Sequence, residues 1–154
     1  MNFWLMKTEP GTFGIDDLQK APRRTTSWDG VRNYQVRNML RDQIKRGDLT
    51  FIYHSSCARP GIVGIAEIVR EAYPDPTQFD RKHDHYDPKS SSSAPRWLTV
   101  DVKYQRRLKR VISLDELRKL ENKALAGLLL LRAGNRLSIT PVAPPHWDSI
   151  LALE

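Results

Sequence analysis

The sequence predicts an α+β domain built around a small, curved, mixed β-barrel of about five to six strands, flanked by short helices. Strand-like segments alternate with short helical ones along 154 residues, a length that suits one domain with one core. The segments 48–55 and 61–73 carry large apolar residues on both faces. That pattern is typical of strands that are buried on two sides or that curl into a barrel. We therefore expect a single domain over residues 1–154.

The first elements are bounded by clear turn signals. Residues 2–7 are aromatic and apolar and predict a strand, and residues 15–20 predict a short helix that ends before Pro22. A longer helix is expected from Val31 to about Arg46, because its apolar residues fall on one helical stripe and Gly47 follows it.

The second half is expected to hold two further strands and three helices around a long loop. Residues 74–96 are rich in proline and serine and predict a surface loop. The other expected elements are a strand over 97–108, a helix opened by the capping box of Ser113 and Glu116, a buried helix over 125–133, a strand over 136–140 and a helix over 144–154.

The charge balance favours a polyanionic partner. The chain has 25 Lys and Arg against 18 Asp and Glu, a net charge of +7, which is most simply explained by nucleic-acid binding. The single cysteine, Cys57, excludes a disulfide framework and a cysteine-based zinc site. No apolar run reaches the roughly 20 residues of a membrane span. These features lead us to expect a cytoplasmic or nuclear protein.

The turn Trp28-Asp29-Gly30 stands just before the long helix and permits two interpretations. Taken alone, it is most simply a core tryptophan followed by an aspartate that caps the helix. The functional alternative is a flat ring beside a hydrogen-bonding side chain, which is what reading one unstacked base requires.

Other polar clusters give weaker signals. Tyr53, His54 and Ser55 end a strand, where pockets are common. His54 with Cys57 could form a nucleophile pair, but no third residue orients them. The histidines and aspartates of segment 82–87 lie in the long loop without spacing that would aim them at a metal, so we expect a solvated loop and no metal site.

Arginine-rich runs are the candidates for contacts with phosphate, because the planar guanidinium pairs with phosphate better than an ammonium does. The candidates for contacting a nucleic-acid backbone are Arg23, Arg24, Arg32, Arg37, Arg106, Arg107, Lys109 and Arg110.

Four segments together resemble the EVE domain family: FWLMKTEP, TTSWDGVRNYQVRN, FIYHSSCARPGIVGIAEIVREAYPDPTQFD and RLSITPV. The resemblance extends from Asn2 nearly to the C-terminus. It implies a PUA-like fold, similar to YTH and SRA domains, which accept a single flipped or unpaired modified base in an aromatic pocket. It therefore implies a non-catalytic reader of a modified base, most plausibly C5-modified cytosine in DNA, or else modified RNA.

Carried over to this sequence, the resemblance implies a set of pocket residues from four segments. These are Trp4, Lys7, Glu9, Trp28, Asp29, Asn33, Tyr34, Tyr53, His54, Ser55, Arg136 and Ser138. It implies no cofactor and no membrane, and we expect a monomer whose partner is DNA or RNA carrying a modified base. Because no basic extension precedes the first motif, we expect a bacterial-type cytoplasmic member.

Two alternatives remain open at this point. One is an enzyme acting on a nucleotide-like small molecule through Asp29, His54 or Cys57, although the sequence has no phosphate-binding glycine loop. The other is an adaptor that binds a protein through the loop 74–96.

Overall fold

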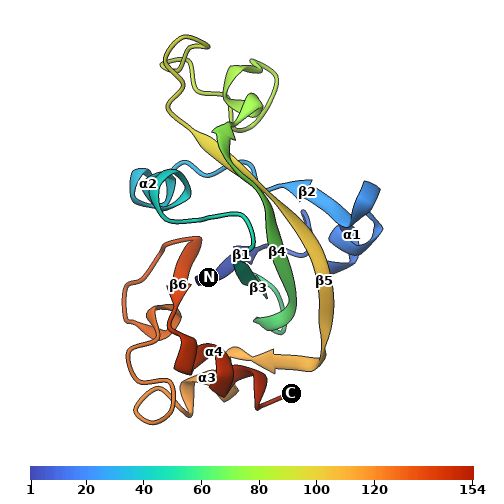
Figure 1. Cartoon of the computed structure of the whole chain (residues 1–154), viewed down its shortest axis with the longest axis vertical. Coiled ribbons are helices and arrows are strands. Elements are labelled where there is room, and N and C mark those ends of the chain that lie inside the picture. The colour runs from blue at the N-terminus through green and yellow to red at the C-terminus, as the bar shows by residue number, and fades with distance from the viewer.

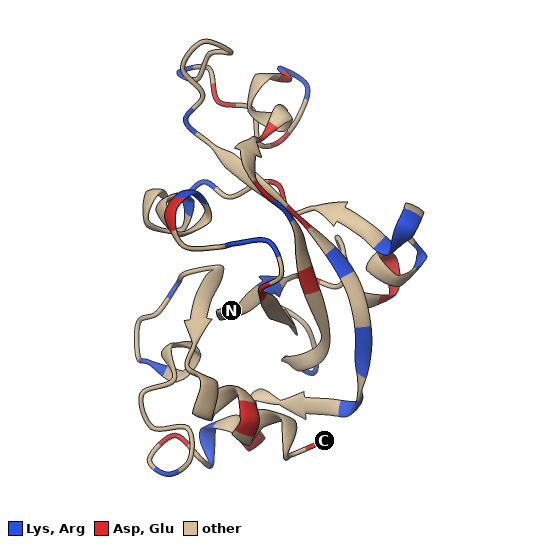
Figure 2. Ribbon diagram, in the orientation of Figure 1, with Lys and Arg blue, Asp and Glu red and all other residues tan.

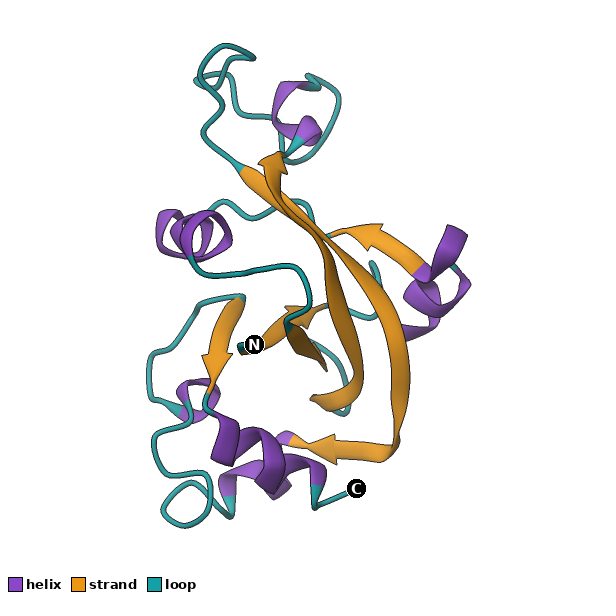
Figure 3. Cartoon of the chain, in the orientation of Figure 1, coloured by secondary structure: helices purple, strands orange, loops and turns teal.

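The computed structural model describes residues 1–154 and contains one six-stranded mixed sheet (Figures 1 and 3). The strand order is β2-β5-β4-β3-β1-β6, in which β1 and β3 are parallel and the other neighbours are antiparallel. The strands are β1 Phe3–Thr8, β2 Thr25–Ser27, β3 Leu49–His54, β4 Gly61–Pro74, β5 Leu98–Ser113 and β6 Ile139–Val142.

The helices are short and lie between the strands in the chain. The α-helices are α1 Ile15–Lys20, α2 Tyr34–Asp42, α3 Leu114–Arg118 and α4 Pro144–Leu151, and the 3-10 turns are Pro22–Arg24, Pro76–Phe79 and Leu129–Leu131. None of these helices has the length and apolar character that crossing a membrane requires.

The α+β class is confirmed, but the expected closed barrel is wrong. The sheet is open, because its edge strands β2 and β6 do not pair with each other. Both edges are short, with three residues in β2 and four in β6. Pro141 in β6 has no N–H to donate to a further strand, which suits an edge and prevents regular pairing there.

The curvature that the sequence predicted comes from β4 and β5, the two long strands that bend across the molecule (Figure 1). Their pairing shifts register at four places, and such bulges bend and twist a strand pair. Gly64 allows close packing here, because a Cβ at this position would lie 2.8 Å from Ile15 Cδ1 and 2.9 Å from the carbonyl oxygen of Arg106.

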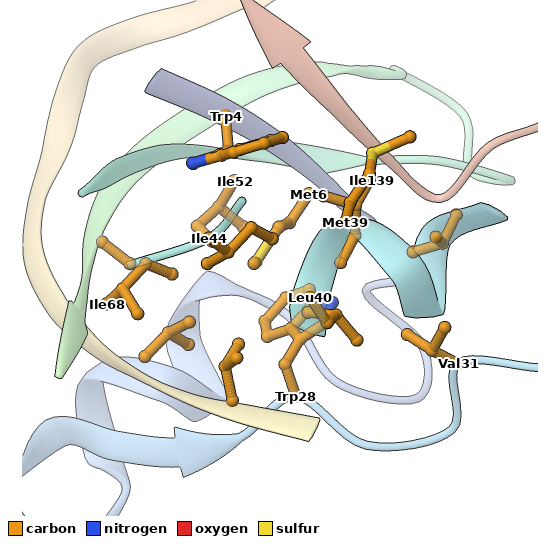
Figure 4. Close-up of a cluster of buried hydrophobic side chains, with 14 of the residues drawn as sticks. Trp4, Met6, Trp28, Val31, Met39, Leu40, Ile44, Ile52, Ile68 and Ile139 are labelled. Carbon is orange, nitrogen blue, oxygen red and sulfur yellow. The ribbon is translucent and has the colours of Figure 1, made fainter. Parts of the chain in front are cut away.

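Two apolar clusters cover the two faces of the sheet. Successive residues of β1 separate between them, with Trp4 and Met6 in the first and Leu5 in the second. Helices α1 and α2 pack on the first cluster, which Figure 4 shows, and α3 and α4 pack on the second. In the second cluster Trp147 of α4 stacks on Phe51, with ring centroids 3.8 Å apart.

Element ends differ from the sequence predictions for identifiable reasons. Helix α2 begins at Tyr34, not Val31, because Asn33 is its N-cap and accepts a hydrogen bond from the Val36 N–H. The expected helix over 125–133 is only a 3-10 turn, since Gly127 adopts φ +87° and breaks the helical path.

Strand positions also moved. The last strand lies two to three residues beyond the predicted 136–140, at Ile139–Val142, and β5 continues past residue 108 to Ser113. The short strand β2 was not predicted, because three residues of Thr and Ser carry no apolar alternation.

Candidate nucleic-acid interface

A solvent-open cavity lies where the parallel strands β1 and β3 both end. It consists of two adjoining hollows of about 360 and 400 Å³. Both hollows are lined by Lys7, Thr8, Trp28, Asp29 and His85, and we refer to their union as the Trp28 cavity. The first hollow adds Thr12, Phe13, Thr26 and Ser27, and the second adds Glu9, Gly30, Val31, Ser55, Arg136 and Ser138.

Trp28 is held rigidly at the boundary between this cavity and the core. It directly follows β2, and its backbone N–H donates to the carbonyl of Val100 at 2.8 Å. The residue is 9% exposed and belongs to the first apolar cluster (Figure 4). Most of Trp28 therefore packs on the core, and the residue also lines the cavity.

Gly30 lets the imidazole of His85 reach the cavity. Its φ of +85° lies in the left-handed region that favours glycine. A Cβ at this position would lie 2.5 Å from Cε1 and 2.8 Å from Nδ1 of His85. The His85 ring therefore lies flush against the Gly30 backbone, and its Nδ1 is buried without a hydrogen-bond partner.

The backbone of His85 is held in place by Arg32. The guanidinium donates to the His85 carbonyl at 2.6 and 3.1 Å, to the Thr77 hydroxyl at 3.1 Å and to Asp75 Oδ2 at 3.1 Å. The Asp75 side chain is fully buried and also accepts from the Gly30 N–H at 2.9 Å. This network ties the loop 74–96 to the turn that carries Trp28 and Asp29.

Burial and neighbouring charge shift the titration of three groups in and beside the cavity. Desolvation raises the pKa of Asp29, and the nearby Asp75 carboxylate raises it further. Desolvation lowers the pKa of Lys7. For Asp75 desolvation acts upward, but hydrogen bonds from Thr77, Gly30 and Arg32 outweigh it, so the pKa of Asp75 is lowered. Burial therefore raises the pKa of Asp29, whereas hydrogen bonds lower the pKa of Asp75.

The structure brings seven of the twelve expected pocket residues together and leaves five elsewhere. Lys7, Glu9, Trp28, Asp29, Ser55, Arg136 and Ser138 line the cavity. Trp4, Asn33, Tyr34, Tyr53 and His54 do not.

Two of those five are core residues. Trp4 is 1% exposed, and its Nε1–H donates to Asp48 Oδ2 at 3.0 Å. Tyr53 is 4% exposed and packs in the second apolar cluster, on the other side of the sheet. Both residues alternate with their neighbours into the two cores, so neither can contact a ligand in the Trp28 cavity.

The other three have local roles outside the cavity. Asn33 caps α2, a role that the sequence had assigned to Asp29. Tyr34 is half exposed and stacks on Trp97 with ring centroids 4.7 Å apart. His54 Nε2 accepts a hydrogen bond from the Ile15 N–H at 3.1 Å, which fixes the start of α1.

Most of the expected phosphate-binding arginines are already paired within the chain, although Figure 2 shows basic residues along β5. Arg106 binds Glu154, Arg107 binds Asp16 and Arg110 binds Glu116. Arg32 is half-buried and binds Asp75, as described above. Arg37 donates to Asn38 Oδ1 and to the carbonyl of Arg96, and it lies over the Tyr34 ring. Runs of arginine in the sequence therefore overstate the free positive charge.

Four of the eight basic residues form no salt bridge: Arg23, Arg24, Lys109 and Arg37, whose partners are neutral oxygens. Arg23 and Arg24 are exposed in a turn with φ of 57° and 53°, and Arg24 lies 5.6 Å from the Tyr104 ring centroid. The Lys109 side chain is exposed, and its backbone N–H donates to Glu154.

Eight residues that line the cavity were not expected there: His85, Thr8, Thr12, Phe13, Thr26, Ser27, Gly30 and Val31. The segment 82–87 was expected to be a solvated loop, and for His85 this is wrong, because Arg32 and Gly30 hold it against the cavity. The position of His85 depends on the contact between Arg32 in the turn and Asp75 after β4, which are 43 residues apart in the sequence. Nothing in the sequence near either residue indicates that the two meet.

Comparison with known proteins gives consistent matches over nearly the whole chain. The model of the EVE domain matches residues 2–153. Thymocyte nuclear protein 1 of Rattus norvegicus is 48% identical over 167 residues, which cover 99% of this chain and 74% of the rat protein. The human protein of the same name is 47% identical over 98% of this chain and 73% of its own length.

Solved structures agree with this result. The human THYN1 protein in complex with 5-methylcytosine-containing DNA has a TM-score of 0.94 and 44% identity, covering 99% of this chain and 97% of that one. A crystal structure of a Pseudomonas putida protein has a TM-score of 0.92 and 44% identity, covering 98% of each chain. The resemblance inferred from the four sequence motifs is confirmed.

The expected location is corrected by the same comparison. The animal relatives are named as nuclear proteins, which contradicts a bacterial-type cytoplasmic protein. That expectation rested on a single cysteine and on the lack of a basic segment before the first motif. Neither feature determines the compartment in which a protein is located.

Proposed function

Because this chain belongs to the EVE domain family, we propose that it binds DNA and takes one flipped or unpaired C5-modified cytosine into the Trp28 cavity. The observation that carries the proposal is the convergence on one solvent-open hollow of an indole edge, a carboxyl group, an ammonium group and two hydroxyl groups. These come from Trp28, Asp29, Lys7, Ser55 and Ser138. A relative with 44% identity is known in complex with DNA that contains 5-methylcytosine, and this supports the same class of ligand here.

The polar groups of the cavity match the hydrogen-bonding edge of cytosine. Cytosine presents an amino donor at N4 beside acceptors at N3 and O2. The Asp29 carboxylate lines the cavity and can accept from the amino group. The Lys7 ammonium can donate to O2. A cavity with both signs of hydrogen-bonding partner favours a base over a simple anion.

Apolar groups of the cavity account for selectivity toward a C5 substituent. The Trp28 edge, Phe13 and Val31 offer apolar surface to a methyl group. Burying one methyl group contributes about 0.8 kcal/mol, or about a fourfold change in Kd. Stacking adds on the order of 1–3 kcal/mol per base but does not distinguish the modified base from the plain one. We therefore expect a preference of about fourfold from the methyl contact alone.

The base must leave its stack before it can enter. Extrusion from a duplex costs a few kcal/mol and costs least at a mismatch or in a single strand. The proposal therefore predicts tighter binding when the modified cytosine is unpaired than when it is paired with guanine.

The proposal is for a binding domain and assigns no catalytic step. The nitrogen with which His54 would act as a general base already accepts the Ile15 N–H, and burial lowers the pKa of His54. His54 also lies outside the Trp28 cavity. No hydrogen bond joins it to Cys57, so the enzyme alternative has no support from this pair.

The test measures, by fluorescence anisotropy, the Kd of the whole chain for matched oligonucleotides that carry cytosine or 5-methylcytosine at one position. The oligonucleotides are single-stranded DNA, duplex DNA and RNA. We expect about a fourfold preference for 5-methylcytosine in DNA and a loss of at least tenfold in affinity for Asp29→Ala. Asp148→Ala, an exposed aspartate of α4, is the matched control and should bind normally. Equal Kd values for the two cytosines would refute the selective reading, and a stronger preference on RNA would move the substrate to RNA.

Trp28→Ala is a poor version of this test. The side chain is mostly buried in the first apolar cluster, so truncation would cost about 3–5 kcal/mol of folding free energy. Loss of binding in that variant would not separate a ligand contact from unfolding. Asp29 is exposed, and its substitution leaves the core intact.

A further inference from the structure

A second hollow opens beside the Trp28 cavity and shares one residue with it. This hollow has a volume of about 700 Å³ and lies between α2 and the segment 129–137. Arg136 lines both hollows, so the two adjoin at that residue. We name the second one the Arg132 groove after the other arginine that lines it.

The Arg132 groove is basic and contains no acidic side chain. Its twelve lining residues include two arginines, Arg132 and Arg136, and no Asp or Glu. Both arginines are exposed, and neither forms a salt bridge. This contrasts with Arg106, Arg107 and Arg110 of β5, which are paired with carboxylates. The groove therefore offers free guanidinium groups where the arginine-rich strand does not.

Neutral hydrogen-bonding groups lie opposite these arginines. Gln35 and Asn38 come from α2, and Gln43 directly follows that helix. Side-chain amides donate readily to phosphate and sugar oxygens, and such contacts position a strand without reading its sequence. A groove lined by guanidinium and amide groups matches a phosphodiester chain better than it matches an apolar ligand.

The segment that carries the arginines is fixed by Asn135. The Asn135 side-chain amide donates to the Leu129 carbonyl at 2.8 Å, and its oxygen accepts from the Leu137 N–H at 3.1 Å. The carbonyl of Ser138 then accepts from the Lys7 N–H of β1 at 2.9 Å. Both arginines are thus carried by a segment that is held against the sheet.

We propose that the Arg132 groove binds the sugar–phosphate backbone of the strand on one side of the base held in the Trp28 cavity. This inference rests on the proposed function, because the groove is given a role in backbone binding on the ground that it shares Arg136 with that cavity. One strand would pass its base into the cavity beside Arg136 and continue along the groove to Arg132. Because Arg136 lines both sites, the base in the cavity and the backbone in the groove would be close together along the strand.

The salt dependence of binding tests the groove separately from the base. Each phosphate that is neutralised changes the slope of log K against log salt by about 0.7 for a single strand and about 0.9 for a duplex. We expect Arg132→Gln to reduce the slope by about that amount, to weaken binding by about three- to tenfold at low salt, and to leave the ratio between 5-methylcytosine and cytosine unchanged. Arg118→Gln, an exposed arginine of α3 with no salt bridge, removes the same charge outside the groove and should keep the wild-type slope.

The outcomes separate the two proposals. A slope for Arg132→Gln equal to that of the wild type and of Arg118→Gln overturns the groove, even if the wild type prefers 5-methylcytosine. A wild type without that preference overturns the proposed function, and the slope comparison then still decides whether the groove holds a backbone. A wild type that binds no oligonucleotide at all overturns both.

A length series gives an independent readout. We expect a single strand extended by four nucleotides on one side of the modified base to bind more tightly than the short form, and the same extension on the other side to matter less. The gain should shrink in Arg132→Gln and persist in Arg118→Gln. Equal gains in all three proteins would contradict a backbone in the groove.

Discussion

Gly30 shows how one residue shapes the cavity. Its left-handed φ turns the chain after Asp29, and its missing side chain makes room for the His85 ring. Its N–H also donates to the buried Asp75 carboxylate. Three structural features meet at this one glycine.

Gly30→Ala should therefore damage both stability and binding. We expect a loss of about 1–3 kcal/mol of unfolding free energy, from backbone strain and from the Cβ that would lie 2.5 Å from His85 Cε1. Displacement of His85 should also weaken binding of the 5-methylcytosine oligonucleotide by at least tenfold. Denaturant unfolding and the anisotropy titration measure the two effects.

Gly47→Ala is the matched control. This glycine also has a left-handed φ, +93°, but a Cβ there meets no atom within 4 Å. It should lose stability from backbone strain alone and bind normally. Similar binding losses in both variants would show that His85 has no role in the cavity.

At the residue scale the sequence predicted the positions of the turn residues best, although the cap of α2 is Asn33 and not Asp29. Asp29 lies in the cavity together with its neighbour Trp28. Trp4 and Tyr53 were misplaced, because an aromatic residue on a strand looks the same whether it faces a core or a ligand. The difference depends on which face the helices cover, and that is decided by the whole fold.

The loop 74–96 lies at the surface, as the sequence predicted, but hydrogen bonds within it were not predicted. It contains a buried glutamine, Gln78, whose side chain donates to the carbonyls of Asp75 and Trp97 at 2.7 and 2.8 Å. The Nε1–H of Trp97 donates to Asp87 at 2.7 Å. Polar composition predicted exposure, but these side chains satisfy one another across the loop.

Arg32→Gln should release this loop from the turn. It would leave the fully buried Asp75 carboxylate without its guanidinium partner, at a cost of about 3 kcal/mol of unfolding free energy. We place the cost at the low end of the range for a broken buried pair, because Gly30 and Thr77 still donate to Asp75. Hydrogen exchange across residues 74–96 should rise at the same time.

The exposed pair of Arg41 and Asp42 provides the comparison. Both side chains are 52% exposed, so Arg41→Gln should leave the unfolding midpoint unchanged. An Arg32→Gln protein as stable as Arg41→Gln would show that the buried network does not anchor the loop.

Five of the six strands and their order along the chain followed from hydrophobic patterning, whereas β2 and the helix ends did not. Patterning counts apolar residues and is blind to a cap such as Asn33, so α2 was predicted three residues too early. The leucine run near residue 129 has the composition of a helix, but a left-handed glycine interrupts it.

Across the whole molecule, the open sheet leaves one end of the β1–β3 pair accessible, and the cavity and groove lie there and beside the edge strand β6. Away from this cavity, Glu154 pairs with Arg106 of β5. The carboxylate of Glu154 accepts from Arg106 at 2.6 and 2.9 Å and from the Lys109 N–H at 2.8 Å. No pattern in the sequence indicates that Glu154 pairs with β5.

Acid should weaken the salt bridge between Arg106 and Glu154. The guanidinium of Arg106 lowers the pKa of Glu154 from 4.5 to about 2 in the folded chain. A folded pKa below the unfolded one means that the contribution to stability is complete above pH 4.5 and is lost as pH falls toward 2. We expect the thermal midpoint to fall in that window, and to fall less steeply in Glu154→Gln.

Glu121→Gln, an exposed glutamate outside any salt bridge, is the control for this series. It should follow the wild-type curve. If the thermal midpoint falls equally steeply with pH in the wild type and in Glu154→Gln, the side-chain carboxylate of Glu154 does not stabilise the fold.

The most direct test of the central claim is the map of backbone and imidazole NMR shifts when the labelled chain is titrated with a short single strand that carries one 5-methylcytosine. We predict that the largest changes fall on Lys7, Trp28, Asp29, Gly30 and His85, with smaller ones at Arg132 and Arg136. Unchanged signals at those five residues, with shifts confined to Arg106–Arg110 of β5, would contradict a base in the Trp28 cavity.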